Sequence, residues 1–119
     1  MLTAGDDVML ALHARRSAAA IRAWHELRGD AGLGVVLTGT DLHHDIHVSQ
    51  EAIDSLHRAQ VLVVLHGRGI AGLPAALRSK ACVILQSANR RRPLGKTGHH
   101  LNVVVAGHLR SEKSPETIF

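Results

Sequence analysis

Aromatic side chains are almost absent from this chain. Of its 119 residues only Trp24 and Phe119 are aromatic, and there is no tyrosine. The apolar fraction is nevertheless 45%, so the core has to be built from Leu, Val, Ile and Ala. Such small, often branched residues are typical of parallel strands that helices cover on both faces. The length fits one domain with a real core and is too short for two ordinary domains.

Cysteine and long hydrophobic runs are also scarce. Cys82 is the only cysteine, which excludes an internal disulfide and fits a reducing compartment. Inside its apolar run we expect Cys82 to act as a small buried hydrophobe. No uninterrupted apolar run approaches the roughly 18 residues that a membrane-crossing helix needs. Asp6 and Asp7 stand where a secretion signal carries positive charge. We therefore expect a cytoplasmic protein with no membrane partner.

Acidic residues are outnumbered by basic ones. The formal net charge is +4 and the sequence pI is about 10.2. This balance favours anionic partners such as phosphates, nucleotides or nucleic acid, although a solvated basic surface explains it equally well. Arg90, Arg91 and Arg92 form a basic patch, but no aromatic stacking platform or nucleic-acid motif accompanies it. We therefore expect no nucleic-acid partner.

Short apolar runs alternate with helix-like segments along the chain. This alternation predicts right-handed crossovers and an α/β fold with a Rossmann-like parallel sheet. Gly67–Gly72 has G-x-G-x-x-G spacing, but it follows the third run without a suitably placed acidic residue, so we interpret it as a turn. Strands are expected at 7–12, 33–37, 61–65, 81–85 and 101–106, and helices at 14–27, at 50–58 after an N-cap at Ser49, and from Pro74 to Arg78.

Polar side chains collect at the ends of these expected strands, where open parallel sheets bind their ligands. His13 and Arg15 follow the first strand, and the segment Thr38-Gly39-Thr40-Asp41 follows the second. The first turn of a helix disfavours cations, so Arg15 there favours an anion contact over a solvated side chain. The Thr38–Asp41 segment is equally compatible with a turn capped by Asp41 and with a site where Asp41 acts as a base or orients a hydroxyl. The later strands are followed by His66, Arg68, Gln86, Ser87, Gly107, His108, Arg110 and Lys113.

Histidine, in contrast, is abundant, with ten copies. His43, His44, Asp45 and His47 form a dense cluster in which His43 and His47 would share one helix face, a spacing that suits Zn²⁺. No cysteine or carboxylate motif completes such a site. We therefore interpret the cluster as exposed loop histidines and expect no metal.

Two long motifs make the sequence familiar. They are Leu10–Ala20 (LALHARRSAAA) and Val35–Leu42 (VVLTGTDL), the latter followed by Asp45 and Ile46. With the shorter motifs they resemble the selenosugar synthase branch of the family-4-like glycosyltransferases, which have the GT-B architecture of two Rossmann-like domains. The resemblance covers about Asp7 to Lys113, nearly the whole chain. The shorter motifs lie at 59–65, 73–78, 83–87, 105–110 and 112–113.

The resemblance implies an enzyme that transfers a sugar from a UDP-sugar, a UDP-N-acetylhexosamine, to selenophosphate and so forms a selenosugar. It needs no cofactor beyond the donor substrate. The donor diphosphate gains negative charge as the glycosidic bond breaks, so fixed cations would stabilise the transition state. His108 replaces the family's arginine in the loop that opens the second domain, and Arg110 would supply the lost charge. The implied catalytic residues are Asp41 and His13, the substrate-binding residues are Arg15, Thr38, Gly39 and Thr40, and the donor phosphate-binding residues are Gly107, His108, Arg110 and Lys113.

A domain plan follows from the same resemblance. Residues 1–88 would form a partial N-terminal Rossmann-like domain, 89–100 a linker, and 101–119 the first strand and start of a truncated C-terminal donor-binding domain. The family's glycine-rich opening strand and its ribose-binding acidic motif have no counterpart, and Ser114 replaces an Asp. We therefore expect a central fragment with little transfer activity by itself and an open sheet edge beside the first strand. The alternative is a non-catalytic α/β module that binds a nucleotide or a protein.

Overall fold

A computed structural model describes residues 5–90, 92–93, 95, 98–100, 104 and 114–118 of the chain. The chain divides into two compact units, Met1–Ala88 and Asn89–Phe119. The first unit holds the sheet and every feature discussed below, whereas the described part of the second contains a short 3₁₀-helix, Pro115–Ile118. The strand expected at 101–106 lies outside the described residues except for Val104, which is exposed and has no regular secondary structure.

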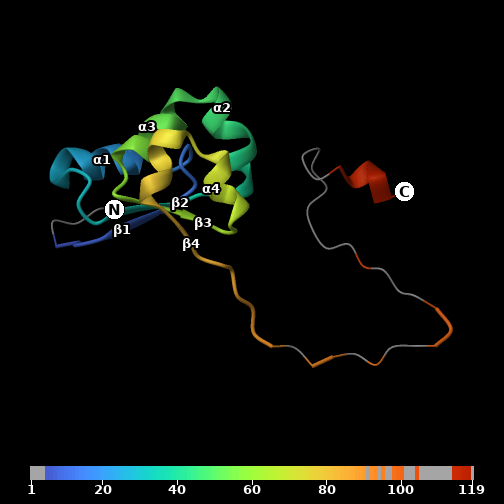
Figure 1. Cartoon of the computed structure of the whole chain (residues 1–119). Helices are drawn as coiled ribbons and strands as arrows, with labels where there is room; N and C mark the ends of the chain where they lie inside the picture. Colours follow the sequence, from blue (N-terminus) through green and yellow to red (C-terminus); the bar gives the residue numbers. More distant parts are fainter. Residues whose placement is uncertain are drawn as a thin grey trace. The chain divides into compact units, whose positions relative to one another are not determined.

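Four parallel strands form the sheet of the first unit, as the alternation of apolar runs predicts (Figure 1). They are β1 (Met9–Leu12), β2 (Leu33–Val36), β3 (Val61–Val64) and β4 (Ala81–Val83), and they lie in the order β1-β2-β3-β4. The α/β fold class with a Rossmann-like parallel sheet is therefore confirmed. Each strand is one or two residues shorter than expected at an end, because the ladder pairing stops before the apolar run does.

Helices and turns connect the strands. α1 (Ala18–Arg28) begins four residues later than predicted, because residues 14–17 form a turn after β1. A π-helix, η1 (Asp41–Asp45), and α2 (Ile46–Val48) follow β2. α3 (Gln50–Arg58) begins where predicted, and the Ser49 hydroxyl caps it by accepting the Ala52 N–H at 3.3 Å. Within the described residues, no helix is long and apolar enough to cross a membrane.

The segment between β3 and β4 departs from the prediction. Gly67–Gly72 does not form a plain turn, since α4 (Arg68–Gly72) occupies it. The helix expected after Pro74 is a 3₁₀-helix, η2 (Ala75–Lys80). Gly69 permits this packing, because a Cβ there would stand 2.9 Å from the Cβ of Val64 on β3. The connection is thus helical but too short for a regular α-helix of ordinary length.

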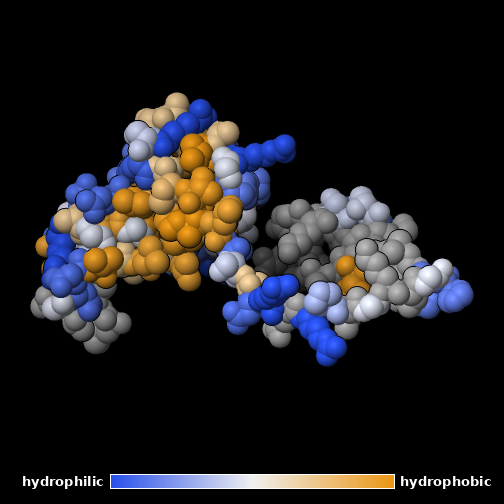
Figure 2. All heavy atoms as spheres, turned by 60° about the horizontal axis from the view of Figure 1, so that its bottom comes forward, coloured by the Kyte–Doolittle hydropathy of each residue, from blue (hydrophilic) through white to orange (hydrophobic). Residues whose placement is uncertain are grey.

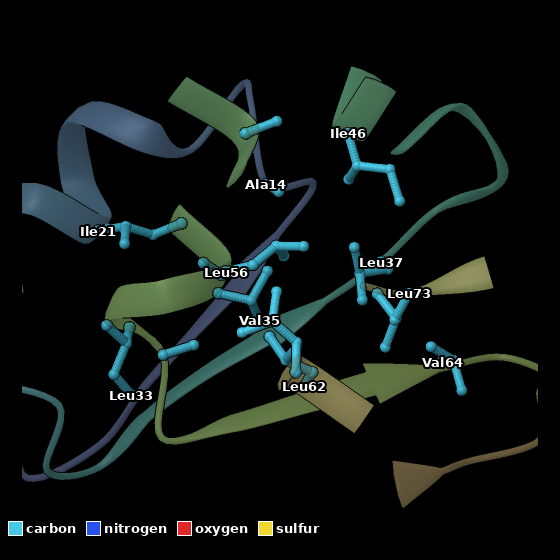
Figure 3. Packing of buried hydrophobic residues seen from close by; sticks show 14 of the residues in the cluster. Ala14, Ile21, Leu33, Val35, Leu37, Ile46, Leu56, Leu62, Val64 and Leu73 are labelled. Atoms are coloured by element: carbon cyan, nitrogen blue, oxygen red, sulfur yellow. The ribbon is translucent and has the colours of Figure 1, made fainter. Parts of the chain in front are cut away.

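The core lies between one face of the sheet and the helices above it. Val35 and Leu62 from the central strands are fully buried and point toward Leu56 of α3 and Ile21 of α1 (Figure 3). Trp24 is 2% exposed, and its indole N–H donates to the carbonyl of Ala31 at 3.0 Å. The single tryptophan therefore anchors α1 to the loop before β2. Leu, Val, Ile and Ala supply most of the rest, as the composition requires.

Much of the opposite face of the sheet is uncovered within the first unit, although Val63, which faces the same side, is only 6% exposed. Leu10 and Leu12 are each 64% exposed, and Val61, Cys82 and Ile84 are exposed on the same side (Figure 2). We call this set the open sheet face. The expectations of helices on both faces and of a buried Cys82 are wrong for this unit. The reason is topological: right-handed crossovers that all advance in one direction place every connecting helix on the same side.

The open sheet face leads to a testable consequence. Contiguous exposed apolar side chains bind the dye ANS and promote association. We expect the double substitution Leu10→Gln and Leu12→Gln to lower ANS fluorescence while leaving the thermal midpoint nearly unchanged. Leu27→Gln is the matched control, because Leu27 is 75% exposed on α1, away from this face. Equal ANS fluorescence in the double variant and in the parent would contradict an open face.

Lys80 ties η2 to the end of α3 and predicts a pH effect. Its Nζ donates to the carbonyls of His57 at 3.0 Å and Ala59 at 2.6 Å. Burial lowers the pKa of Lys80, and the negative charge of Asp30 partly opposes this. Between the lowered pKa and the ordinary 10.5 the unfolded chain binds more protons, so the free energy of unfolding rises with pH across that window. We expect chemical unfolding to show this alkaline rise in the parent and to show it weakened or lost in Lys80→Met. A rise of the same size in both proteins would contradict the assignment.

Candidate functional site

The candidate site begins at the carboxyl end of β1. His13 follows the last residue of this strand and adopts a left-handed backbone with φ of 73°. This conformation is uncommon for residues other than glycine, although Asn, Asp and His adopt it more often than the rest. Its backbone is nevertheless fully engaged: its N–H donates to the carbonyl of Val36 at 3.0 Å, and its carbonyl accepts the Ser17 N–H at 3.0 Å. This turn aims the imidazole across the sheet edge toward the segment that follows β2.

Asp41, the first residue of η1, is fully buried at that edge. Its Oδ1 accepts the backbone N–H of Ala14 at 3.0 Å, although the two residues lie 27 positions apart. Its Oδ2 accepts the N–H and the hydroxyl of Thr38 at 2.8 and 3.0 Å. Three donors thus hold the carboxylate in place. Asp41 therefore joins the ends of β1 and β2. With Thr38 it also forms a reciprocal cap at the start of the helical segment, since the Thr38 hydroxyl accepts the Asp41 N–H at 3.4 Å while the Asp41 carboxylate accepts the Thr38 N–H.

The His13 ring lies between two buried carboxylates. Its Nδ1 is 2.8 Å from Asp41 Oδ1, and its Nε2 is 3.5 Å from Asp45 Oδ2. His13 is 8% exposed, Asp41 0% and Asp45 1%. Among the described residues, neither ring nitrogen nor Asp45 Oδ2 makes a hydrogen bond of good geometry, despite the short distances. The three groups form a compact polar cluster inside an otherwise apolar unit.

Asp45 is a site residue that the sequence did not assign. Besides facing His13, its Oδ1 lies 3.3 Å from Arg15 Nε and 3.2 Å from His44 Nδ1. Its spacing offered one signal: residues four apart on a helix share a face, so Asp45 follows Asp41 on the same side. The π-helical turn that carries both carboxylates is rare and occurs often at functional sites. The motif that contains Asp41 therefore delivers two carboxylates to the site.

Metal binding has to be tested against this geometry. His13, Asp41 and Asp45 each offer a ligand atom, and these atoms lie within 4.8 Å of one another. Part of this set is already engaged by the protein: Asp41 accepts the Ala14 and Thr38 groups, and Arg15 lies beside Oδ1 of Asp45, whereas the His13 ring nitrogens and Asp45 Oδ2 have no hydrogen-bond partner among the described residues. A cation would have to displace Arg15 or lie beside its charge. The cluster therefore fits an ion poorly.

The other predicted site residues fall into four groups. Thr38 supports Asp41, while Gly39 is exposed and Thr40 is half-buried at the start of the helical segment. His47, from the suspected zinc cluster, places its Nε2 3.1 Å from the carbonyl of Leu42, and His43 is exposed. Gln86 and Ser87 are exposed after β4 and belong to no described cluster. The donor phosphate-binding residues Gly107, His108, Arg110 and Lys113 lie outside the described residues.

Known proteins add nothing to this geometry. No protein-family model and no curated protein matches the chain. The case for a function therefore depends on the motifs and on how the fold brings His13, Arg15, Asp41 and Asp45 together.

Proposed function

We propose that this chain is part of the N-terminal domain of a cytoplasmic GT-B glycosyltransferase of the selenosugar synthase kind. One observation carries the proposal. His13, Arg15 and Asp41, which belong to the two long motifs of the resemblance, belong to one polar network at the carboxyl edge of a parallel sheet. Open α/β sheets bind their ligands at this edge.

The proposed chemistry makes use of the charges at the edge. The bond between the sugar C1 and the UDP oxygen breaks, and its electron pair stays on the diphosphate. Selenium of selenophosphate supplies the pair for the new C1–Se bond. Water then attacks phosphorus, the Se–P bond breaks with its electron pair staying on selenium, and phosphate leaves to give the selenosugar. Selenophosphate is an anion. The Arg15 side chain is 48% exposed and its Nε lies 3.3 Å from Asp45 Oδ1, so its terminal N–H groups can make a bidentate contact with such an anion. His13 and Asp41 stand beside it, where the sugar or the acceptor would bind.

The donor side of the proposal rests on the second domain. Gly107, His108, Arg110 and Lys113 would hold the diphosphate, as the family loop does, and the cations among them would stabilise the leaving group. Thr38, Gly39 and Thr40 would contact the sugar from the first domain. Binding measurements can test directly whether the chain prefers uridine nucleotides.

Calorimetric titration of the chain tests the proposal. We expect UDP-N-acetylglucosamine to bind more tightly than ADP-glucose, and thiophosphate, a stable analogue of selenophosphate, to bind in competition with selenophosphate. Arg15→Ala should weaken thiophosphate binding about tenfold or more, as expected for the loss of a charge-assisted bidentate contact. Arg16→Ala is the matched control, since Arg16 is the exposed neighbour of Arg15. Equal affinity for unrelated nucleotides, or equal effects of the two alanine variants, would count against the proposal.

A non-catalytic binding module is the second candidate. The open sheet face favours it, because a large uncovered apolar surface is typical of protein-binding sites. The same titrations separate the two proposals. A module that binds only a protein would show no preference for uridine and no response to Arg15→Ala.

A further inference from the structure

We infer that Asp45 is a positioning residue of this site. It holds Arg15 by Nε and faces His13 Nε2, so that a phosphate-type anion meets the free end of the Arg15 guanidinium next to the imidazole. The class of anion rests on the proposed function, whereas the positioning of the two side chains does not. Asp45 itself is 1% exposed, so it acts through its neighbours and does not touch a ligand in solution.

Asp45 is a buried carboxylate, so its charge has to be compensated by its neighbours. A carboxylate removed from water is costly unless charges or donors compensate it. Here Arg15 Nε at 3.3 Å and His44 Nδ1 at 3.2 Å face Oδ1, while Oδ2 has no aligned donor and lies 3.5 Å from His13 Nε2. The buried oxygen is therefore directed at the one ring that also contacts Asp41.

Arg15 gains order from this contact. A long exposed side chain normally loses rotamer freedom when it binds a ligand, and this loss weakens binding. Asp45 Oδ1 lies at ion-pair distance, 3.3 Å, from the inner end of the guanidinium at Nε, while the side chain remains 48% exposed. The fork of terminal N–H groups is then held ready for two oxygens of one anion.

His13 is oriented by the same residue. Asp41 Oδ1 lies 2.8 Å from Nδ1 and Asp45 Oδ2 lies 3.5 Å from Nε2, although neither contact has the alignment of a hydrogen bond. Two buried carboxylates on opposite nitrogens leave the ring little freedom to rotate. Because Asp45 contacts both His13 and Arg15, a change at either side chain should be transmitted to the other.

Nitrogen-15 NMR of the whole chain tests the positioning without any ligand. In the parent, the Arg15 Nε–H signal should be shifted and ordered relative to that of the exposed Arg16. Asp45→Asn should move it to the Arg16 position and also shift the ring nitrogens of His13. The control is Asp54→Asn, because Asp54 is a partly exposed carboxylate on α3 that pairs with Arg58 at 3.9 Å and accepts the Gln50 amide at 2.8 Å. Unchanged Arg15 and His13 signals in Asp45→Asn would overturn the inference.

A second variant covers the case in which Asp45→Asn does not fold. Arg15→Gln alters a half-exposed side chain and leaves the buried carboxylates in place. Since Asp45 links the two residues, we expect the His13 ring nitrogens to shift in this variant too. His13 signals identical to those of the parent would reject the link.

The affinity for thiophosphate separates a positioning role of Asp45 from a simple effect of its charge. Removal of a nearby carboxylate strengthens the binding of an anion by simple electrostatics. We nevertheless expect Asp45→Asn to weaken thiophosphate binding about three- to tenfold, because the ordered guanidinium is lost. Equal or tighter binding would overturn the positioning role. If the parent binds no thiophosphate, the proposed function fails, and the NMR signals alone decide the role of Asp45.

Discussion

Replacement of Asp41 by alanine is expected to destabilise the first unit by about 3 kcal/mol or more, because each buried donor left without a partner costs about 1–3 kcal/mol. The donors are the N–H of Ala14 and the N–H and hydroxyl of Thr38. They come from the ends of two neighbouring strands, so no local rearrangement can satisfy all three. Urea unfolding followed by far-ultraviolet circular dichroism measures the loss.

Asp54→Ala is the control for this effect, since Asp54 is a partly exposed carboxylate on α3. Its removal should cost less than about 1 kcal/mol, as is usual for exposed ion pairs. Asp41→Asn should fall between the two, because the amide oxygen still accepts part of the donor set. An Asp41→Ala variant as stable as the parent would show that the donors find other partners, and the cluster at the sheet edge would then not be held as described.

Leu62→Ala is expected to cost about 2–5 kcal/mol, the range for emptying a fully packed leucine site. Leu62 is 0% exposed on the central strand β3 and lies under the helices with Val35 (Figure 3). Thermal or urea unfolding gives the loss directly.

Leu12→Ala provides the comparison within the same sheet. Leu12 is 64% exposed on the open sheet face, so its truncation should change the free energy of unfolding by only about 0.5 kcal/mol. A much larger loss of unfolding free energy for Leu62→Ala than for Leu12→Ala supports a sheet that is covered on one face. If Leu12→Ala cost as much as Leu62→Ala, the face would be buried in solution by something that covers it there.

Much of the fold could be predicted because its signals are local. Continuous aliphatic runs such as Val61–Val64 read as strands buried in a parallel sheet, and the alternation with helical segments implies parallel pairing. Ser49 was predictable as an N-cap because the capping oxygen and the N–H it accepts lie three residues apart. His13 and Asp41 could also be placed at strand ends from a local signal. His13 directly follows an apolar run, and Asp41 comes a few residues after the next one.

The chain by itself therefore determined the α/β class, the approximate strands and the gathering of polar residues at one sheet edge. Only the tertiary structure decided that Asp45 joins His13 and Arg15, that Cys82 is exposed, and that one face of the sheet in the first unit is open. These features depend on which strands become neighbours and on which side the crossovers run. Such choices are made between residues about twenty to thirty positions apart, where no local pattern in the sequence records them.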